Sequence, residues 1–199
     1  MRVKSHWFKE GSERGPEELA GAMGFIIWRV AQNTLKRMRG VQFDIEAGPQ
    51  YFAFMSELLA FLIQIADRIA YERMEETRRV EFTTALAKRV ADITDDNQTT
   101  LLGAAATASH RANFIALLNA RAADYAAFGF DEDGPDYGFV RYLGNCVEDV
   151  MTDKDRTWTV SQVMEVEAPE AVSIVRASMA DLLHTGPRTA ARRARMSGD

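Results

Sequence analysis

The stretch from Pro49 to Leu102 contains no glycine and, after Pro49 itself, no proline. These two residue types interrupt helices most strongly, whereas alanine, leucine, glutamate and arginine, which are frequent here, favour them. A single helix of this length would be unusual in a globular domain. The stretch therefore predicts two helices without a strong breaker between them. We place the break in the charged segment 71–79, YERMEETRR, where the apolar periodicity lapses.

The first half of this stretch is strongly apolar. The run from Tyr51 to Ala66 is shorter than the roughly 20 residues that a membrane span requires. It also carries Glu57 near its centre, where an ionised carboxylate at bilayer depth would cost about 3 kcal/mol or more. We therefore exclude a membrane span and predict that residues 50–70 form a central, mostly buried helix.

The polar and small residues of this helix share one narrow stripe. At about 100° per residue, four side chains spaced seven apart nearly align and four more lie beside them. They are Gln50, Glu57, Gln64 and Tyr71, flanked by Ala53, Ser56, Ala60 and Asp67. In the favoured interpretation the stripe faces solvent or a close helix, with Glu57 near water or paired with an arginine such as Arg29.

The alternative interpretation places a ligand pocket along the stripe. Small residues would line the pocket and Glu57 and Gln64 would point into it, because carboxylates in apolar walls are suited to acid–base chemistry. The candidate pocket residues are Glu57, Gln64, Asp67 and Arg29. Both interpretations stay open, because one helix does not reveal which way its stripe faces.

Start and stop signals predict helices along the rest of the chain. Gly15 followed by Pro16 predicts a start and Gly40 an end, and Gly48 before Pro49 repeats the start signal. Further helices are expected around Val80–Ile93, after the cap residue Ser109, over 137–151, through Val163, and from Pro169 onward. Loops are expected around 94–110 and 128–138, with Pro135 opening the helix that follows the second loop.

Alternating β-branched runs are missing from this pattern, so the fold class is all-α. We predict a single-domain helical bundle of six or seven helices over residues 15–184. Residues 1–14 are expected to form an N-terminal arm and residues 185–199 a basic flexible tail. The N-terminus shows no secretory signal pattern, which predicts a cytoplasmic protein.

Charge is unevenly distributed. The chain carries a net charge of −5, which disfavours a general nucleic-acid or anionic-membrane surface. The tail has a net charge of +3, from Arg188, Arg192, Arg193 and Arg195 against Asp199. These four arginines are the candidate partner-binding residues, and weak nucleic-acid binding through them is one alternative function.

Metal and cysteine chemistry have little support. The only cysteine, Cys146, excludes an intramolecular disulfide and a cysteine-based zinc site, and it lies at the edge of an apolar face, where a buried thiol is expected. Asp181-x-x-His184 is a single pair where a di-iron bundle needs two. The acidic segment 131–136 fails the calcium-loop spacing and is read as a turn. We therefore expect no metal and no cofactor.

No short catalytic motif occurs, so enzymatic activity is left open. The leading expectation is a non-catalytic interaction or regulatory protein with an unknown protein partner, and a homodimer. The dimer is inferred from apolar surface, because residues 51–69 and the run Phe25–Trp28 exceed what one small bundle readily covers. Coverage by the helices at 137–151 and 169–184 is the alternative. A helical enzyme or small-ligand binder using the Gln50/Glu57/Gln64 stripe is the second candidate function.

Overall fold

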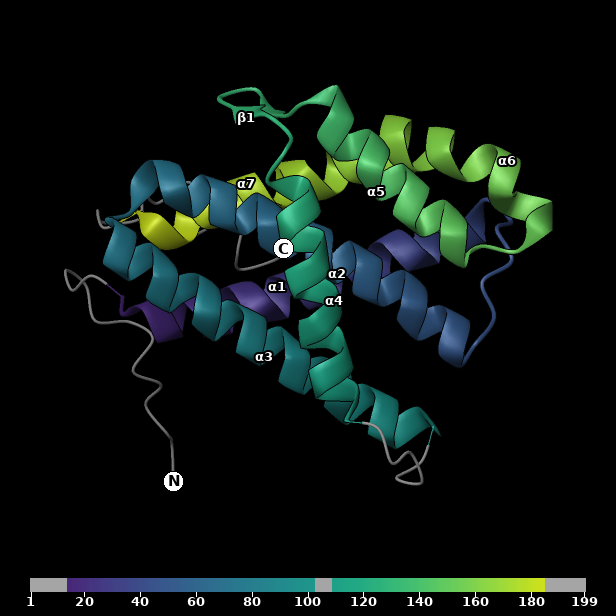
Figure 1. The fold of residues 1–199 in the computed structure, drawn as a ribbon, viewed down its shortest axis with the longest axis horizontal. Coiled ribbons are helices and arrows are strands. Elements are labelled where there is room, and N and C mark those ends of the chain that lie inside the picture. Colours follow the sequence, from purple (N-terminus) through teal and green to yellow (C-terminus); the bar gives the residue numbers. More distant parts are fainter. Residues whose placement is uncertain (1–13, 103–108, 185–199) are drawn as a thin grey trace, which may run out of the picture.

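A computed structural model describes residues 14–102 and 109–184 of the chain (Figure 1). The helices are α1 (Pro16–Gly40), α2 (Pro49–Arg73), α3 (Glu76–Leu102), α4 (His110–Tyr125), α5 (Tyr137–Val150), α6 (Asp153–Gln162), the π-helical turn η2 (Val163–Glu167) and α7 (Ala168–Leu183). Two short antiparallel strands, β1 (Phe130–Asp131) and β2 (Gly134–Pro135), make one hairpin. The all-α, single-domain prediction is confirmed. Helices α6 and α7 are joined by η2 without a break and form one continuous rod. Counting this rod as one helix gives six helices, and counting α6 and α7 separately gives seven.

The central position of α2 is the main organising feature of the fold. Every residue from Phe54 to Ile63 is buried, and α2 contacts α1, α3, α4, α5 and α7. Burying one large apolar side chain contributes about 1.5–3 kcal/mol, so this helix supplies much of the core. Among the described residues, no helix combines the length and apolarity needed to cross a bilayer. The predicted central helix is confirmed.

Helix boundaries follow local signals at several positions. Gly15 and Gly48 precede the prolines that open α1 and α2. Gly48 has a φ of 112°, which favours glycine over any residue with a side chain. The break between α2 and α3 lies within the predicted segment, where Met74 adopts an extended conformation. These boundaries depend on neighbouring residues alone, which is why the sequence predicts them.

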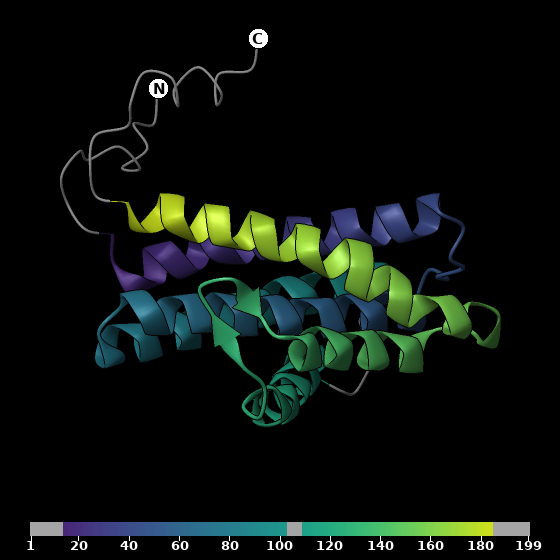
Figure 2. The same cartoon turned by 90° about the horizontal axis from the view of Figure 1, so that it is seen from above.

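Later helices cover the apolar surface of α1 and α2. Figure 2 shows α7 running beside α1, and α5 and α7 both contact α2. Ile27 and Trp28 are buried, whereas Phe25 remains 57% exposed. The surface from which we inferred a dimer is therefore largely covered within the chain. This outcome removes that argument for a dimer without testing the oligomeric state.

The predicted loop at 94–110 is helical over much of its length. Helix α3 continues to Leu102, and the side chains of Thr94 and Asn97 donate hydrogen bonds to carbonyls four residues back. Such bonds let polar residues remain within a helix. Ser109 does cap α4, as expected, because its hydroxyl oxygen accepts a hydrogen bond from the backbone N–H of Ala112.

One of the two later predictions about proline is wrong. Pro135 does not open α5 but lies in β2, and Asp136 caps that helix by accepting from the backbone N–H of Phe139. Pro169 lies in the first turn of α7, as expected, where its missing N–H costs no helix hydrogen bond. The π-helical turn η2 precedes α7 without a break.

Candidate functional site

The carboxylate of Glu57 faces α4 and is paired with Arg121. The Nε and Nη2 atoms of Arg121 donate to the two carboxylate oxygens at 2.8 and 2.7 Å. Glu57 is only 6% exposed. The hydrogen bond to this carboxylate raises the pKa of Arg121, so the guanidinium stays charged. The pairing arginine is thus Arg121 rather than Arg29, and an acid–base role for Glu57 would require this pair to open.

The ion pair extends into a polar network that reaches α5. Arg121 donates from Nη1 to the hydroxyl oxygen of Tyr142 at 3.1 Å, and the Tyr142 hydroxyl donates to the carboxylate of Asp124. Burial, followed by the bond to Asp124, raises the pKa of Tyr142. Burial likewise raises the pKa of the Cys146 thiol to about 11. Cys146 is therefore a protonated, buried thiol, as expected, and a poor nucleophile.

The other candidate stripe residues contact different parts of the fold. Asp67 accepts from Arg79 Nε at 2.9 Å and from the Thr83 hydroxyl at 2.7 Å, which ties α2 to α3. Gln64 is half-buried on α2. Arg29 is exposed on α1, with its guanidinium 5.8 Å from the ring centroid of Phe25. The structure does not bring Glu57, Asp67 and Arg29 into one cluster.

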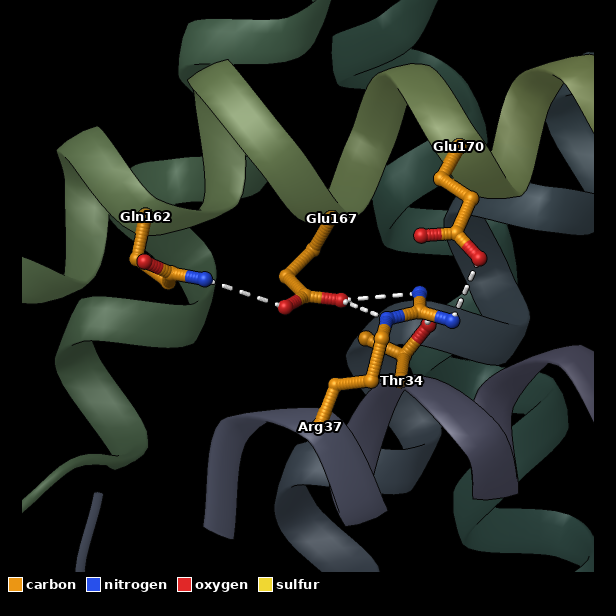
Figure 3. A network of polar contacts seen from close by, with 5 residues as sticks. All are labelled: Thr34, Arg37, Gln162, Glu167 and Glu170. Atoms are coloured by element: carbon orange, nitrogen blue, oxygen red, sulfur yellow. Dashed lines mark hydrogen bonds and ion pairs between the residues drawn. The ribbon is translucent and has the colours of Figure 1, made fainter. Parts of the chain in front are cut away.

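A second buried network joins α1 to the π-helical turn (Figure 3). Glu167, 1% exposed, accepts from Arg37 Nε at 2.9 Å and from Gln162 Nε2 at 3.1 Å. Arg37 also donates to Glu170 at 2.8 Å and to the Thr34 hydroxyl at 3.2 Å. Sequence reasoning missed Arg37 and Glu167. The available signal was spacing, because Glu167 falls in register with buried residues four positions before and after it, Val163 and Ala171.

The described residues contain neither a metal site nor the arginines of the tail. Within residues 14–102 and 109–184, no three His, Cys, Asp or Glu side chains are grouped closely enough to hold a metal ion. His184 is exposed directly after α7. Arg188, Arg192, Arg193 and Arg195 lie outside the described residues, so their assignment as partner-binding residues stays a prediction.

Helix α4 presents a free face made of small, uncharged residues. The helix packs on α2 and α3 through Phe114, Leu118 and Tyr125, and Figure 2 shows it on the outer side of the α2–α3 layer. We define the alanine face by six exposed residues: Ala112, Asn113, Ala116, Asn119, Ala120 and Ala123. Its later alanines lie 4, 8 and 11 residues after Ala112. At about 100° per residue, this spacing keeps all four alanines within one narrow sector of the helix. This regularity is readable in the sequence, but our sequence analysis considered only the buried side of α4.

The chemical character of the alanine face is unusual for this chain. Charged residues make up 27% of the sequence, yet none is among these six, and the exposed Asp124 lies at the edge of the face, one turn after Ala120. A helix face exposed only to water normally carries charged or long polar side chains.

No family model, curated protein or solved structure matches the chain. The functional argument therefore depends on the geometry of the molecule itself.

Proposed function

We propose that the protein is a non-catalytic helical protein that acts through protein–protein contact and pairs with a second copy through the alanine face of α4. The observation that carries this proposal is the exposed, uncharged face of a helix that packs on one side only among the described elements. Depletion of charged residues is characteristic of the centre of protein interfaces. Alanine also allows two helices to approach closely, so that many backbone atoms come into contact.

A second copy is the partner that suits this face best. A two-fold axis places the face against itself, so any charge on it would meet its own copy and repel it. The amides of Asn113 and Asn119 each contain donors and an acceptor, and can therefore bond to the same group across the axis. Leu101, which is 65% exposed, adds apolar area at the end of α3.

The hydrogen bonding of the buried carboxylates supports a non-catalytic role for the protein. Three carboxylates are buried in the described part of the chain, and each accepts hydrogen bonds from other residues. Glu57 is bonded to Arg121 and Glu167 to Arg37, while Asp155 accepts from the backbone N–H of Asp44 at 2.6 Å. Their oxygens are engaged in joining elements of the fold, which leaves them poorly placed to receive a substrate proton.

Light scattering across a dilution series tests the proposal. The native chain should exceed its monomer mass of 22.3 kDa at high concentration and approach it on dilution. Ala116→Glu and Ala123→Glu place like charges across the two-fold axis and should shift the protein to monomer. The matched control is Ala180→Glu, which makes the same change at an exposed alanine of α7 and should leave association unchanged. A native chain that stays monomeric at every concentration would contradict the dimer.

A further inference from the structure

A cavity of about 460 Å³ lies between the β-hairpin, the first turn of α5 and the outer side of α7. Its volume is within the range of about 300–1,000 Å³ that is typical of small-molecule sites. The side chains that matter for its chemistry are Asp133, Pro135, Val140, Val172, Ser173 and Arg176. The cavity is distinct from the Glu57 stripe and from the alanine face, because none of its lining residues belongs to either.

The guanidinium of Arg176 is held in place at this cavity. Its Nη1 donates to the carbonyl oxygen of Asp133 at 2.7 Å, and its Nη2 donates to the carbonyl of Glu132. Both acceptors are neutral, and a guanidinium has five N–H donors, so charge and donors remain for a ligand. Gly134 permits this approach: its φ is 121°, and a Cβ there would lie 3.2 Å from Arg176 Nη1.

Asp133 places a negative charge near the positive guanidinium of Arg176. Asp133 is one of the residues that line the cavity, and its backbone N–H donates to Asp131 Oδ1 at 2.9 Å. Across the described residues, no hydrogen bond or ion pair engages the Asp133 carboxylate. The cavity thus combines a free carboxylate, a fixed guanidinium and the Ser173 hydroxyl with apolar walls.

We propose that this cavity binds a small zwitterion with an aliphatic body, of the α-amino-acid class. Its carboxylate bonds to Arg176, its ammonium group to Asp133, and its side chain packs between Val140 and Val172. A simple anion would leave Asp133 nearby as a repelling charge, and a simple cation would meet the same difficulty with Arg176. Exposed ion pairs are individually weak, so we expect a dissociation constant on the order of 1 mM.

Titration followed by two-dimensional NMR of the full chain separates the possible ligands. The probes are L-leucine, 3-methylbutylamine, which lacks the carboxylate, and 4-methylpentanoate, which lacks the ammonium group. Leucine should give saturable shifts at the hairpin and α7 and bind several-fold more tightly than either analogue. Equal binding of leucine and one analogue would overturn the zwitterion assignment. Absence of saturable shifts with leucine would overturn the site.

Variants locate the two contacts. Asp133→Asn keeps the backbone carbonyl that holds Arg176. It should weaken the binding of leucine several-fold and leave the binding of 4-methylpentanoate unchanged. Asp149→Asn removes the same charge from an exposed position on α5 and is the matched control, with no expected effect. Ser173→Trp should fill the cavity and abolish leucine binding, and an unchanged circular dichroism spectrum checks that this variant folds. Native-like leucine binding by either Asp133→Asn or Ser173→Trp would refute the proposal.

Discussion

Glu57 of α2 and Arg121 of α4 form a two-bonded ion pair that fastens an outer helix to the central one. The carboxylate is nearly inaccessible, whereas the arginine side chain retains 24% exposure. The pair therefore stands at the boundary between core and solvent. Its main structural effect is to join α4 to α2.

Breaking this pair from one side should destabilise the protein. Arg121→Met leaves a buried carboxylate without its partner, so we expect a loss of about 3 kcal/mol in the free energy of unfolding, measured by urea denaturation. The double variant Glu57→Leu with Arg121→Met should recover most of this loss, because no charge then remains buried. The control is Arg111→Met, which removes an exposed pair with Asp92 and should cost about 0–1 kcal/mol. Equal losses for the two arginine variants would contradict a special role for the Glu57 pair.

The Arg37 network offers a comparison of two glutamates that share one arginine. Glu167 is buried, and its loss leaves the Gln162 amide and part of the Arg37 guanidinium without an acceptor, so Glu167→Ala should cost about 2–4 kcal/mol. Glu170 is 48% exposed, so Glu170→Ala should cost under about 1 kcal/mol. Chemical denaturation of both variants measures the difference. A larger cost at Glu170 would show that the exposed contact dominates.

The Cys146 thiol should make stability fall at alkaline pH. Its pKa is raised from an ordinary value of 9.0 to about 11 in the folded chain. Between these values the unfolded chain has lost the thiol proton while the folded chain keeps it, so unfolding releases a proton. Stability should therefore fall by up to about 1.4 kcal/mol per pH unit across this window, and the decline should level off above it.

Comparison with Cys146→Ala isolates this contribution from other groups that titrate at high pH. The difference between the native and variant free energies of unfolding should be constant below pH 9 and should shrink as the pH rises towards 11. Denaturation curves recorded at each pH give both quantities. Parallel pH profiles for the two proteins would mean that the thiol ionises equally easily in both states.

Hydrogen exchange should separate the central helix from the outer one. The amides from Leu58 to Ile65 lie in a helix surrounded by five others, so they should exchange only through global unfolding. Helix α4 packs on one side only, and its amides should exchange faster by local opening. Mass spectrometry of peptides from the two helices measures this. Comparable protection in the monomer would show that α4 unfolds together with the core.

Much of the fold could be predicted because its signals are local or periodic. The starts at Pro16 and Pro49 follow from backbone chemistry of adjacent residues. The burial of α2 follows from apolar side chains around most of its circumference, which no arrangement could leave in water without a large cost. The cap at Ser109 depends only on the N–H three residues later.

Failures occurred where a local signal competed with packing. Around Thr94 and Asn97 the polar residues suggested a loop, but hydrogen bonds within the helix keep α3 intact to Leu102. At Pro135 the proline suggested a helix start, but this residue pairs in the β-hairpin and Asp136 caps α5 instead.

Local and periodic signals were enough to show that the chain is helical, where several of its helices begin, and which helix forms the centre. The packed structure was needed to show that Glu57 meets Arg121, that Arg37 meets Glu167, and that the outer face of α4 is exposed. The two kinds of information differ in range. Helix signals act over a few residues, whereas an ion pair between helices depends on the rotation and crossing of two helices, which the packing of all their apolar faces sets together.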